Sequence, residues 1–213
     1  IDRAPKIYLP KLPKVLFRIL TEEELTTIFQ SNQLRTDTEI GKRNRALISF
    51  MLDTGVRLSE VANLELEALS LRDGAARIFG KGSKERLVFF SEATETAIKL
   101  WLTVRGDEAG SLFWLKASGV RMLIDRIQAE TGIEVFHAHK IRHTAFTMLV
   151  RNKVDIHTVK RIAGHSSLSV TEQYLSLSND DLRASHRQAS PVDQVMATIT
   201  PPTPHRRRWG NRA

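Results

Sequence analysis

Two stretches decide how this chain is read: residues 139–144, H-K-I-R-H-T, and residues 161–174, R-I-A-G-H-S-S-L-S-V-T-E-Q-Y. The first places His139 and Arg142 one helical turn apart, so that both side chains share one helix face. The second places a Gly-His turn at His165 and then a single tyrosine, Tyr174. A phosphodiester needs cationic partners, and an attacking phenol needs a site that favours its charge. The two stretches therefore indicate chemistry on a phosphate group.

The composition is that of a globular protein without disulfides or membrane spans. The chain has 213 residues, enough for one domain with a good core, and 41% of them are hydrophobic. Cysteine is absent, which excludes disulfide and thiolate chemistry and fits a reducing cytosol. No apolar run approaches ~18 residues, so we expect no membrane span.

The formal net charge of +8 is concentrated at the two ends of the chain. Residues 1–20 hold five Lys or Arg and one acid, and residues 180–213 hold six and three, which leaves about +1 for residues 21–179. A basic tail alone is weak evidence for nucleic-acid binding, because solvated Lys and Arg runs are common. Between His139 and His165, however, six Lys or Arg accompany one acid, Asp155. Positive charge therefore gathers around the two informative stretches.

Periodicity and turn signals predict an α+β fold, mainly α, with one small three-stranded antiparallel sheet. Thr21 with Glu24 forms a capping box that opens the first helix. Asp73-Gly74 and residues 80–84 separate three strand-like runs, which is the pattern of successive hairpins. The predicted helices are 21–31, 44–52, 59–64, 92–104, 119–130, 139–151, 155–162, 169–175 and 179–188, and the predicted strands are 68–71, 76–79 and 86–90.

Three segments are expected along the chain. Residues 1–20 carry three prolines without periodicity and read as a lead-in or linker. Residues 21–195 form the folded domain, and residues 196–213, with P-P-T-P and R-R-R, read as a disordered basic tail. The first residues show neither an initiator Met nor a signal-peptide pattern, which indicates a fragment of a longer chain.

The turn T-G-V-R-L-S-E at residues 54–60 is a candidate phosphate site. Gly55 ends the apolar helix before it, and Ser59 can cap the helix after it. Arg57 lies between them, where its guanidinium can project toward a phosphate. The plainer alternative is a surface arginine paired with Glu60.

The hairpin G-K-G-S-K-E-R at residues 80–86 offers a second basic turn. Lys81 lies between two glycines, which permit a tight turn and close approach to a ligand. From there Lys81 can enter a DNA groove or give a proton to a leaving oxygen, although a flexible loop lysine is the plainer reading. We expect Lys84 and Arg86 to contact backbone phosphate in either case.

The histidines do not read as a metal site. His143 lies one turn beyond His139, but no Glu follows His139 and no third ligand stands at a useful spacing. His137 is expected to be structural. His165 alone reads as a capping group, and a helical tyrosine such as Tyr174 is more often core than nucleophile. Neighbouring cations change that balance, because they favour the phenolate.

Together these residues resemble the tyrosine recombinase, or phage integrase, family over about residues 19–193. T-G-V-R-L-S-E is similar to the family's first arginine motif, G-K-G-S-K-E-R to its hairpin lysine motif, H-K-I-R-H-T to its His-x-x-Arg motif, A-G-H-S-S to its Leu-Gly-His motif and Q-Y-L to its nucleophile motif. One departure is Ala163, where the family usually has Leu, and we expect local loosening there rather than lost chemistry. Most family members also carry an N-terminal helical domain that clamps the other face of the DNA, and here only the short lead-in precedes the expected catalytic part.

The resemblance implies a site-specific DNA recombinase that needs no cofactor and no metal. The implied catalytic residues are Arg57, Lys81, His139, Arg142, His165 and Tyr174, with Glu60 holding Arg57 and with Lys84, Arg86, Lys140 and Arg161 on DNA. The implied partners are double-stranded DNA at recombination sites and further copies of the chain, in a tetramer on two DNA sites that exchanges a C-terminal helix, here residues 180–195. Mobile-element or phage integration and excision are the implied processes, in the cytoplasm and on DNA.

Two alternatives remain open at this point. A type IB topoisomerase uses similar residues and relaxes supercoils without joining two partners. A DNA-binding module without catalysis is the other, although the presence of every implied catalytic residue argues against it.

Overall fold

The computed structural model describes residues 18–80 and 85–164. The chain divides into two compact units, residues 1–175 and 176–213, and every described residue belongs to the first. Lys81, Lys84, His165 and Tyr174 lie outside the described residues, as do the helices predicted at 169–175 and 179–188. The predicted segment limits at residues 20 and 195 stay predictions.

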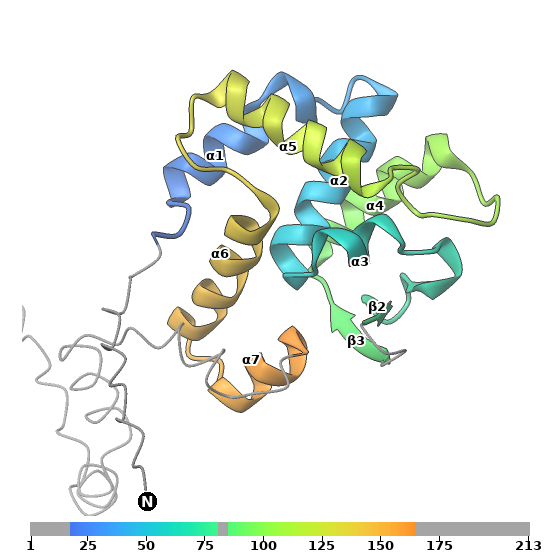
Figure 1. Ribbon diagram of the computed structural model, residues 1–213. Coiled ribbons are helices and arrows are strands. Elements are labelled where there is room, and N and C mark those ends of the chain that lie inside the picture. The colour runs from blue at the N-terminus through green and yellow to red at the C-terminus, as the bar shows by residue number, and fades with distance from the viewer. Residues whose placement is uncertain (1–17, 81–84, 165–213) are drawn as a thin grey trace, which may run out of the picture. The chain divides into compact units, whose positions relative to one another are not determined.

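The described part is mainly helical, as predicted (Figure 1). Its longest helix, α2, runs centrally through the unit and packs against α4 on one side and α6 on another. The α-helices are α1 (Glu22–Gln30), α2 (Glu39–Thr54), α3 (Leu58–Ala62), α4 (Glu92–Arg105), α5 (Ala117–Thr131), α6 (Ala138–Arg151) and α7 (Ile156–Ala163), and the 3-10 helices are η1 (Asn32–Leu34) and η2 (Leu66–Ala68). No described helix is both long and apolar enough to cross a membrane.

The ends of the helices follow from their capping residues. The predicted capping box is confirmed: the Thr21 hydroxyl accepts from the Glu24 backbone N–H, and the Glu24 carboxylate accepts from the Thr21 N–H at 2.9 Å. The prediction that Ser59 caps α3 is wrong. Arg57 is the residue before that helix, and its backbone N–H donates to the Glu60 carboxylate at 2.8 Å. The Glu60 carboxylate, and not the Ser59 hydroxyl, therefore accepts a backbone N–H at the start of α3.

The three predicted strands form the predicted antiparallel sheet, in the order β1 (Leu69–Ser70), β2 (Ala75–Phe79) and β3 (Glu85–Phe89). Gly74 turns the first hairpin with a φ of 57°. The β2–β3 register pairs Ile78 with Arg86 and Ala76 with Val88. Ala76, Ile78 and Val88 are buried on the inner face, so the residue paired with Ile78 also faces the protein interior.

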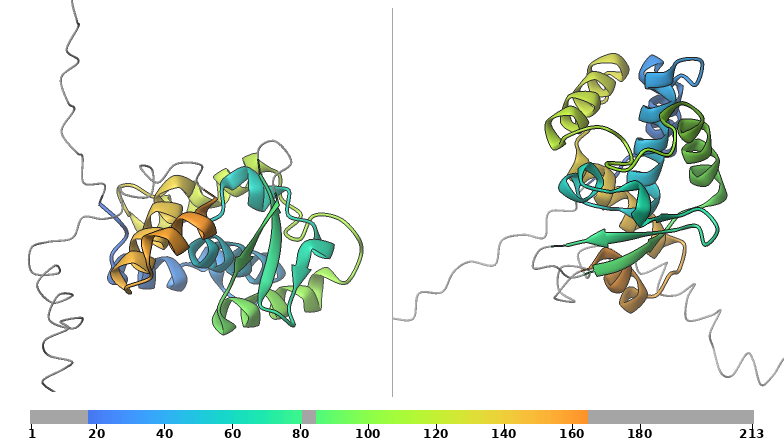
Figure 2. Two further views of the ribbon diagram at one scale, coloured as in Figure 1. Left: turned by 90° about the horizontal axis from the view of Figure 1, so that it is seen from below. Right: turned by 90° about the vertical axis from the view of Figure 1, so that its right-hand side faces the viewer.

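Two apolar cores hold these elements together. The larger one is built on α2 and extends from α1 to the start of α6. A separate small cluster joins α6 to α7 and consists of Phe146, Val150, Val159 and Ala163. Figure 2 shows α7 in orange beside the strands, and α7 contacts both α6 and β3.

Candidate active site

Arg57 lies in the tight connection between α2 and α3. The connection turns at Gly55, whose φ of 62° closes α2 in the left-handed region. Val56 is fully buried and fixes the next residue, while the Arg57 side chain remains 47% exposed. This short, anchored turn holds Arg57 at the surface with a guanidinium that solvent or a ligand can reach.

Glu60 joins two arginines from different elements. Its side chain is only 5% exposed. Arg57 Nη1 donates to Glu60 Oε1 at 2.9 Å, and Arg86 of β3 donates to both carboxylate oxygens at 2.9 and 2.8 Å. Two-pronged pairing of this kind is the strongest arrangement for an arginine and a carboxylate. Glu60 is therefore held firmly, and it in turn holds Arg57.

Arg86, predicted to contact backbone phosphate, points inward in the structure. Its side chain is 13% exposed, and Nε donates to the Ile162 carbonyl at 3.2 Å while the terminal nitrogens donate to Glu60. Its Cδ also lies 2.9 Å from where a Cβ on Gly164 would stand, so Gly164 leaves room for it. Arg86 thus ties β3 to both α3 and the end of α7.

Arg142 is buried, at 4% exposure, in the middle of α6. Nη1 donates to the Gly55 carbonyl at 2.5 Å and Nη2 donates to the Ala163 carbonyl at 2.8 Å. The guanidinium lies over the Phe146 ring with its central carbon 4.6 Å from the ring centroid. Arg142 therefore links the turn that carries Arg57 to the end of α7.

The remaining predicted residues of this region are more exposed. His139 lies in the first turn of α6 and stacks with His137, with 6.4 Å between the ring centroids. His137 is structural, as expected, because its Nδ1 accepts the Lys140 backbone N–H and caps α6. Lys140 donates from its ammonium to the Arg18 carbonyl, and Arg161 is exposed in the last turn of α7. Within residues 18–80 and 85–164, no group of three or more acidic or His side chains is placed to hold a metal ion.

The structure thus brings Arg57, Glu60, Arg86 and Arg142 into one connected network around the end of α7. Sequence reasoning missed the two carbonyls that receive Arg142 and the ring beneath it. Phe146 follows Arg142 by four residues, which places both on one helix face, and this spacing was an available signal. The carbonyls of Gly55 and Ala163 carried no such signal, because backbone acceptors look alike in any sequence.

The sequence model of the phage integrase family matches residues 18–180 of the chain. The chain belongs to the phage integrase family. Tyrosine recombinase XerC of Corynebacterium glutamicum is 32% identical over 199 residues, which cover 89% of this chain and 64% of that relative. Tyrosine recombinase XerC of Oceanobacillus iheyensis is 30% identical, with 87% and 65% covered. This chain therefore spans slightly less than two thirds of the length of these curated relatives.

Solved structures agree with this integrase-family assignment. The crystal structure of XerA recombinase superposes with a TM-score of 0.68 at 26% identity and covers 86% of this chain and 67% of that chain. XerH site-specific recombinase bound to its difH substrate gives a TM-score of 0.64 at 27% identity, with 89% and 58% covered. The mainly helical fold with its small sheet is thus the fold of tyrosine recombinases.

In this integrase-family chain, the acid sensitivity of the network depends on Glu60. Burial raises the pKa of the Glu60 carboxyl, but hydrogen bonds from Arg86 and the Arg57 backbone, with the charge of Arg86, outweigh burial and lower it from 4.5 to about 2. Between these two values the unfolded chain binds more protons than the folded one, so stability falls as the pH falls. The full contribution of Glu60, roughly 3 kcal/mol by this difference, is present above pH ~4.5 and lost toward pH ~2.

We therefore expect the free energy of unfolding to decrease as the pH is lowered from about 4.5 toward 2, because Glu60 must then be protonated. Chemical denaturation at a series of pH values measures this dependence. Glu60→Gln removes the titrating group and should flatten the slope in that window. Asp37→Asn is a matched control, since Asp37 pairs with Arg35 at the surface with 55% of its side chain exposed. An unchanged slope in Glu60→Gln would contradict the assignment.

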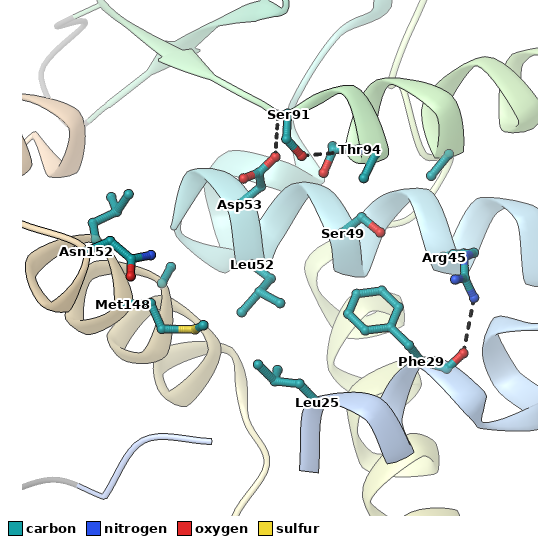
Figure 3. Close-up of a pocket in the computed structure, with 14 residues that line it drawn as sticks. Leu25, Phe29, Arg45, Ser49, Leu52, Asp53, Ser91, Thr94, Met148 and Asn152 are labelled. Carbon is teal, nitrogen blue, oxygen red and sulfur yellow. Dashed lines mark hydrogen bonds between the residues drawn. The ribbon is translucent and has the colours of Figure 1, made fainter. Parts of the chain in front are cut away.

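A hollow of about 470 Å³ lies elsewhere, among α1, α2, α4 and α6 (Figure 3). Its walls are mostly apolar, including Leu25, Leu52 and Met148. Its two charged residues form hydrogen bonds with the protein backbone: Arg45 donates to the Phe29 carbonyl at 3.1 Å, and Asp53 accepts the Ser91 N–H at 2.5 Å. None of the predicted site residues lines this hollow, so the arginine network remains the candidate active site.

Proposed function

We propose that this chain is the catalytic part of a site-specific tyrosine recombinase, which cleaves and rejoins DNA strands through a 3′-phosphotyrosyl intermediate. One observation carries the proposal. Arg57 and Arg142, which come from separate motifs of an integrase-family chain, are joined through the Gly55 turn and held in fixed orientations by Glu60 and by backbone carbonyls. Fixed cationic groups are what a phosphoryl transition state requires.

In the proposed reaction, the Tyr174 phenol attacks the phosphorus and its oxygen forms the new P–O bond. The bond to the 5′ oxygen breaks, and Lys81 gives that oxygen a proton, which releases a 5′-hydroxyl. Arg57 and Arg142 neutralise the non-bridging oxygens, His165 adds a hydrogen bond, and the first-turn histidine of α6, His139, assists proton transfer from the phenol. The phosphotyrosyl link keeps the energy of the broken bond, so a partner 5′-hydroxyl reverses the step without ATP or another cofactor.

The proposal predicts a covalent adduct between the chain and DNA that carries its recombination site. A nicked suicide substrate, which loses the 5′-hydroxyl fragment by diffusion, should trap the adduct as a band of lower mobility in a denaturing gel. Tyr174→Phe removes the nucleophilic oxygen and should abolish the band while DNA affinity is retained. Adducts from Tyr174→Phe would show that another residue attacks. Binding without adducts from the unaltered chain would support a DNA-binding module instead.

A topoisomerase-like activity is distinguished by the products. A recombinase joins strands that come from two different duplexes, whereas a type IB enzyme only relaxes a supercoiled plasmid. Two duplexes of different length and label, mixed with the chain, should yield a hybrid product. Plasmid relaxation without hybrids would favour the topoisomerase-like alternative.

Oligomerisation is part of the same proposal. We propose that four copies act together on two double-stranded DNA sites, in the cytoplasm and on the DNA of the host or of a mobile element, and that residues after Ser178 link neighbouring copies. Truncation after Ser178 should then reduce the pairing of two DNA sites more than it reduces binding to one site. Gel-shift assays that separate one-site from two-site complexes measure both quantities. Equal losses would contradict the role given to this segment.

A further inference from the structure

We propose that Arg86 is a positioning residue that aims Arg57 through Glu60, and that it is not a contact to DNA. This inference rests on the proposed strand cleavage, because aiming matters only if Arg57 meets a phosphate. Contacts among β3, α3 and α7 support this role.

The Arg86 guanidinium is already oriented by protein oxygens. Three N–H groups of its guanidinium donate to protein oxygens, two to Glu60 at 2.9 and 2.8 Å and one to Ile162 at 3.2 Å. An arginine has five such donors in one rigid plane, so the plane is set by these three bonds. The guanidinium is thus committed to the buried carboxylate of Glu60, and turning it toward a DNA phosphate would break that pairing.

Arg86 also determines how the Glu60 carboxylate pairs with Arg57. Glu60 Oε1 accepts from both arginine side chains, and Glu60 Oε2 accepts from Arg86 and from the Arg57 backbone N–H. Without Arg86, the carboxylate would be free to turn and pair with Arg57 through both oxygens, since two-pronged pairing is favoured. That pairing would neutralise Arg57 and turn its donors away from the exposed side, where 47% of its side chain now lies open.

Arg86 also links this carboxylate to α7. Arg86 crosses the end of that helix, and a Cβ on Gly164 would come within 2.9 Å of its Cδ and 3.1 Å of its Nε. Gly164 has a φ of 63° and immediately precedes His165 in the chain. The same side chain therefore holds Glu60, the partner of Arg57, and lies against Gly164, the residue before His165.

The test separates DNA affinity from cleavage rate in Arg86→Ala and Arg86→Lys. A phosphate contact contributes about one unit to the slope of log affinity against log salt. A positioning residue leaves this slope unchanged and lowers the single-turnover rate of adduct formation at saturating DNA, here by an expected 100-fold or more. Lysine keeps the charge but cannot hold both oxygens of Glu60, so Arg86→Lys should not restore the rate.

Arg77→Ala is the matched control. Arg77 lies on the neighbouring strand with its side chain exposed, and its substitution removes the same charge as Arg86→Ala. Arg77→Ala should keep the cleavage rate. The double variant Glu60→Gln/Arg86→Ala should be no slower than the slower single variant, since both residues act through one contact. The proposal would be overturned if Arg86→Ala reduced the salt slope of DNA affinity by about one and left the rate of adduct formation at saturating DNA unchanged. It would also be overturned if the unfolded fraction of the variant explained the whole loss of rate.

A separate readout keeps this inference distinct from the proposed function. If the unaltered chain forms no adduct, the proposed function fails, and the Arg86–Glu60 contact is still tested by denaturation against pH. Arg86→Lys should then move the acid-dependent loss of stability to higher pH, because the pKa of Glu60 rises when its two-pronged partner is removed. An unmoved acid transition would overturn the role of Arg86. Arg86→Lys also provides the reading if Arg86→Ala does not fold.

Discussion

Replacing Gly55 with alanine should lower the free energy of unfolding by roughly 2–5 kcal/mol. The backbone at Gly55 has a φ of 62°, and the left-handed region costs a non-glycine residue about 1–2 kcal/mol. The new Cβ would also stand 2.6 Å from the Phe146 ring, in a core where overpacking costs about 1–3 kcal/mol more. Urea denaturation of the two proteins measures the difference.

Gly132→Ala is the matched control for the backbone cost alone. Gly132 closes α5 with a φ of 68° and the same type of cap, but no atom lies within 4 Å of its added Cβ. Gly132→Ala should therefore cost only about 1–2 kcal/mol. Gly55→Ala combined with Phe146→Leu should recover part of the larger loss. Equal costs at the two glycines would show that Phe146 does not constrain the turn.

Replacing Arg142 with alanine should reduce adduct formation by about 100- to 1,000-fold, the usual effect of removing one group that stabilises transition-state charge. It should also destabilise the fold by roughly 2–4 kcal/mol, because the carbonyls of Gly55 and Ala163 lose a charged donor. Single-turnover cleavage and denaturation are measured on the same preparation. The rate is then expressed per folded molecule.

Arg142→Lys separates the effect of the positive charge from that of the guanidinium shape. An ammonium keeps the charge but cannot bridge two carbonyls that the planar guanidinium reaches from separate nitrogens. Its cleavage rate should therefore remain at least about tenfold below that of the unaltered chain. Arg151→Ala, at the exposed end of the same helix, is the control for loss of charge and should cleave normally. Full activity in Arg142→Lys would show that charge alone suffices.

The helices and the sheet were predictable because their signals are local. The Thr21–Glu24 capping box, the Asp73-Gly74 hairpin and the closing glycine at Gly55 each act within a few residues of the chain. The bounds of the elements differ from the predicted ones by only a few residues at most ends. Helix α2 begins at Glu39, earlier than predicted, because Thr38 caps it. Thr38 lies in a polar stretch without apolar periodicity, so the pattern did not indicate this start.

The connections between the site residues were not predictable in the same way. Arg86 resembled a basic hairpin residue, and only the register that pairs it with the buried Ile78 shows that it faces inward. Likewise, the His-x-x-Arg spacing indicated a shared helix face but could not show which backbone carbonyls receive Arg142. Long-range partners depend on how separate elements pack, and a single sequence does not contain that information directly.

The small core between α6 and α7 has a consequence for how the protein unfolds. α7 is fastened by four fully or nearly buried apolar residues and by two arginines that donate to the consecutive carbonyls of Ile162 and Ala163. Regions with few apolar contacts open at a lower free energy than the global core. We therefore expect α7 to open as a local cooperative unit, with amide hydrogens that exchange before those of α2, and its opening would break both arginine contacts together.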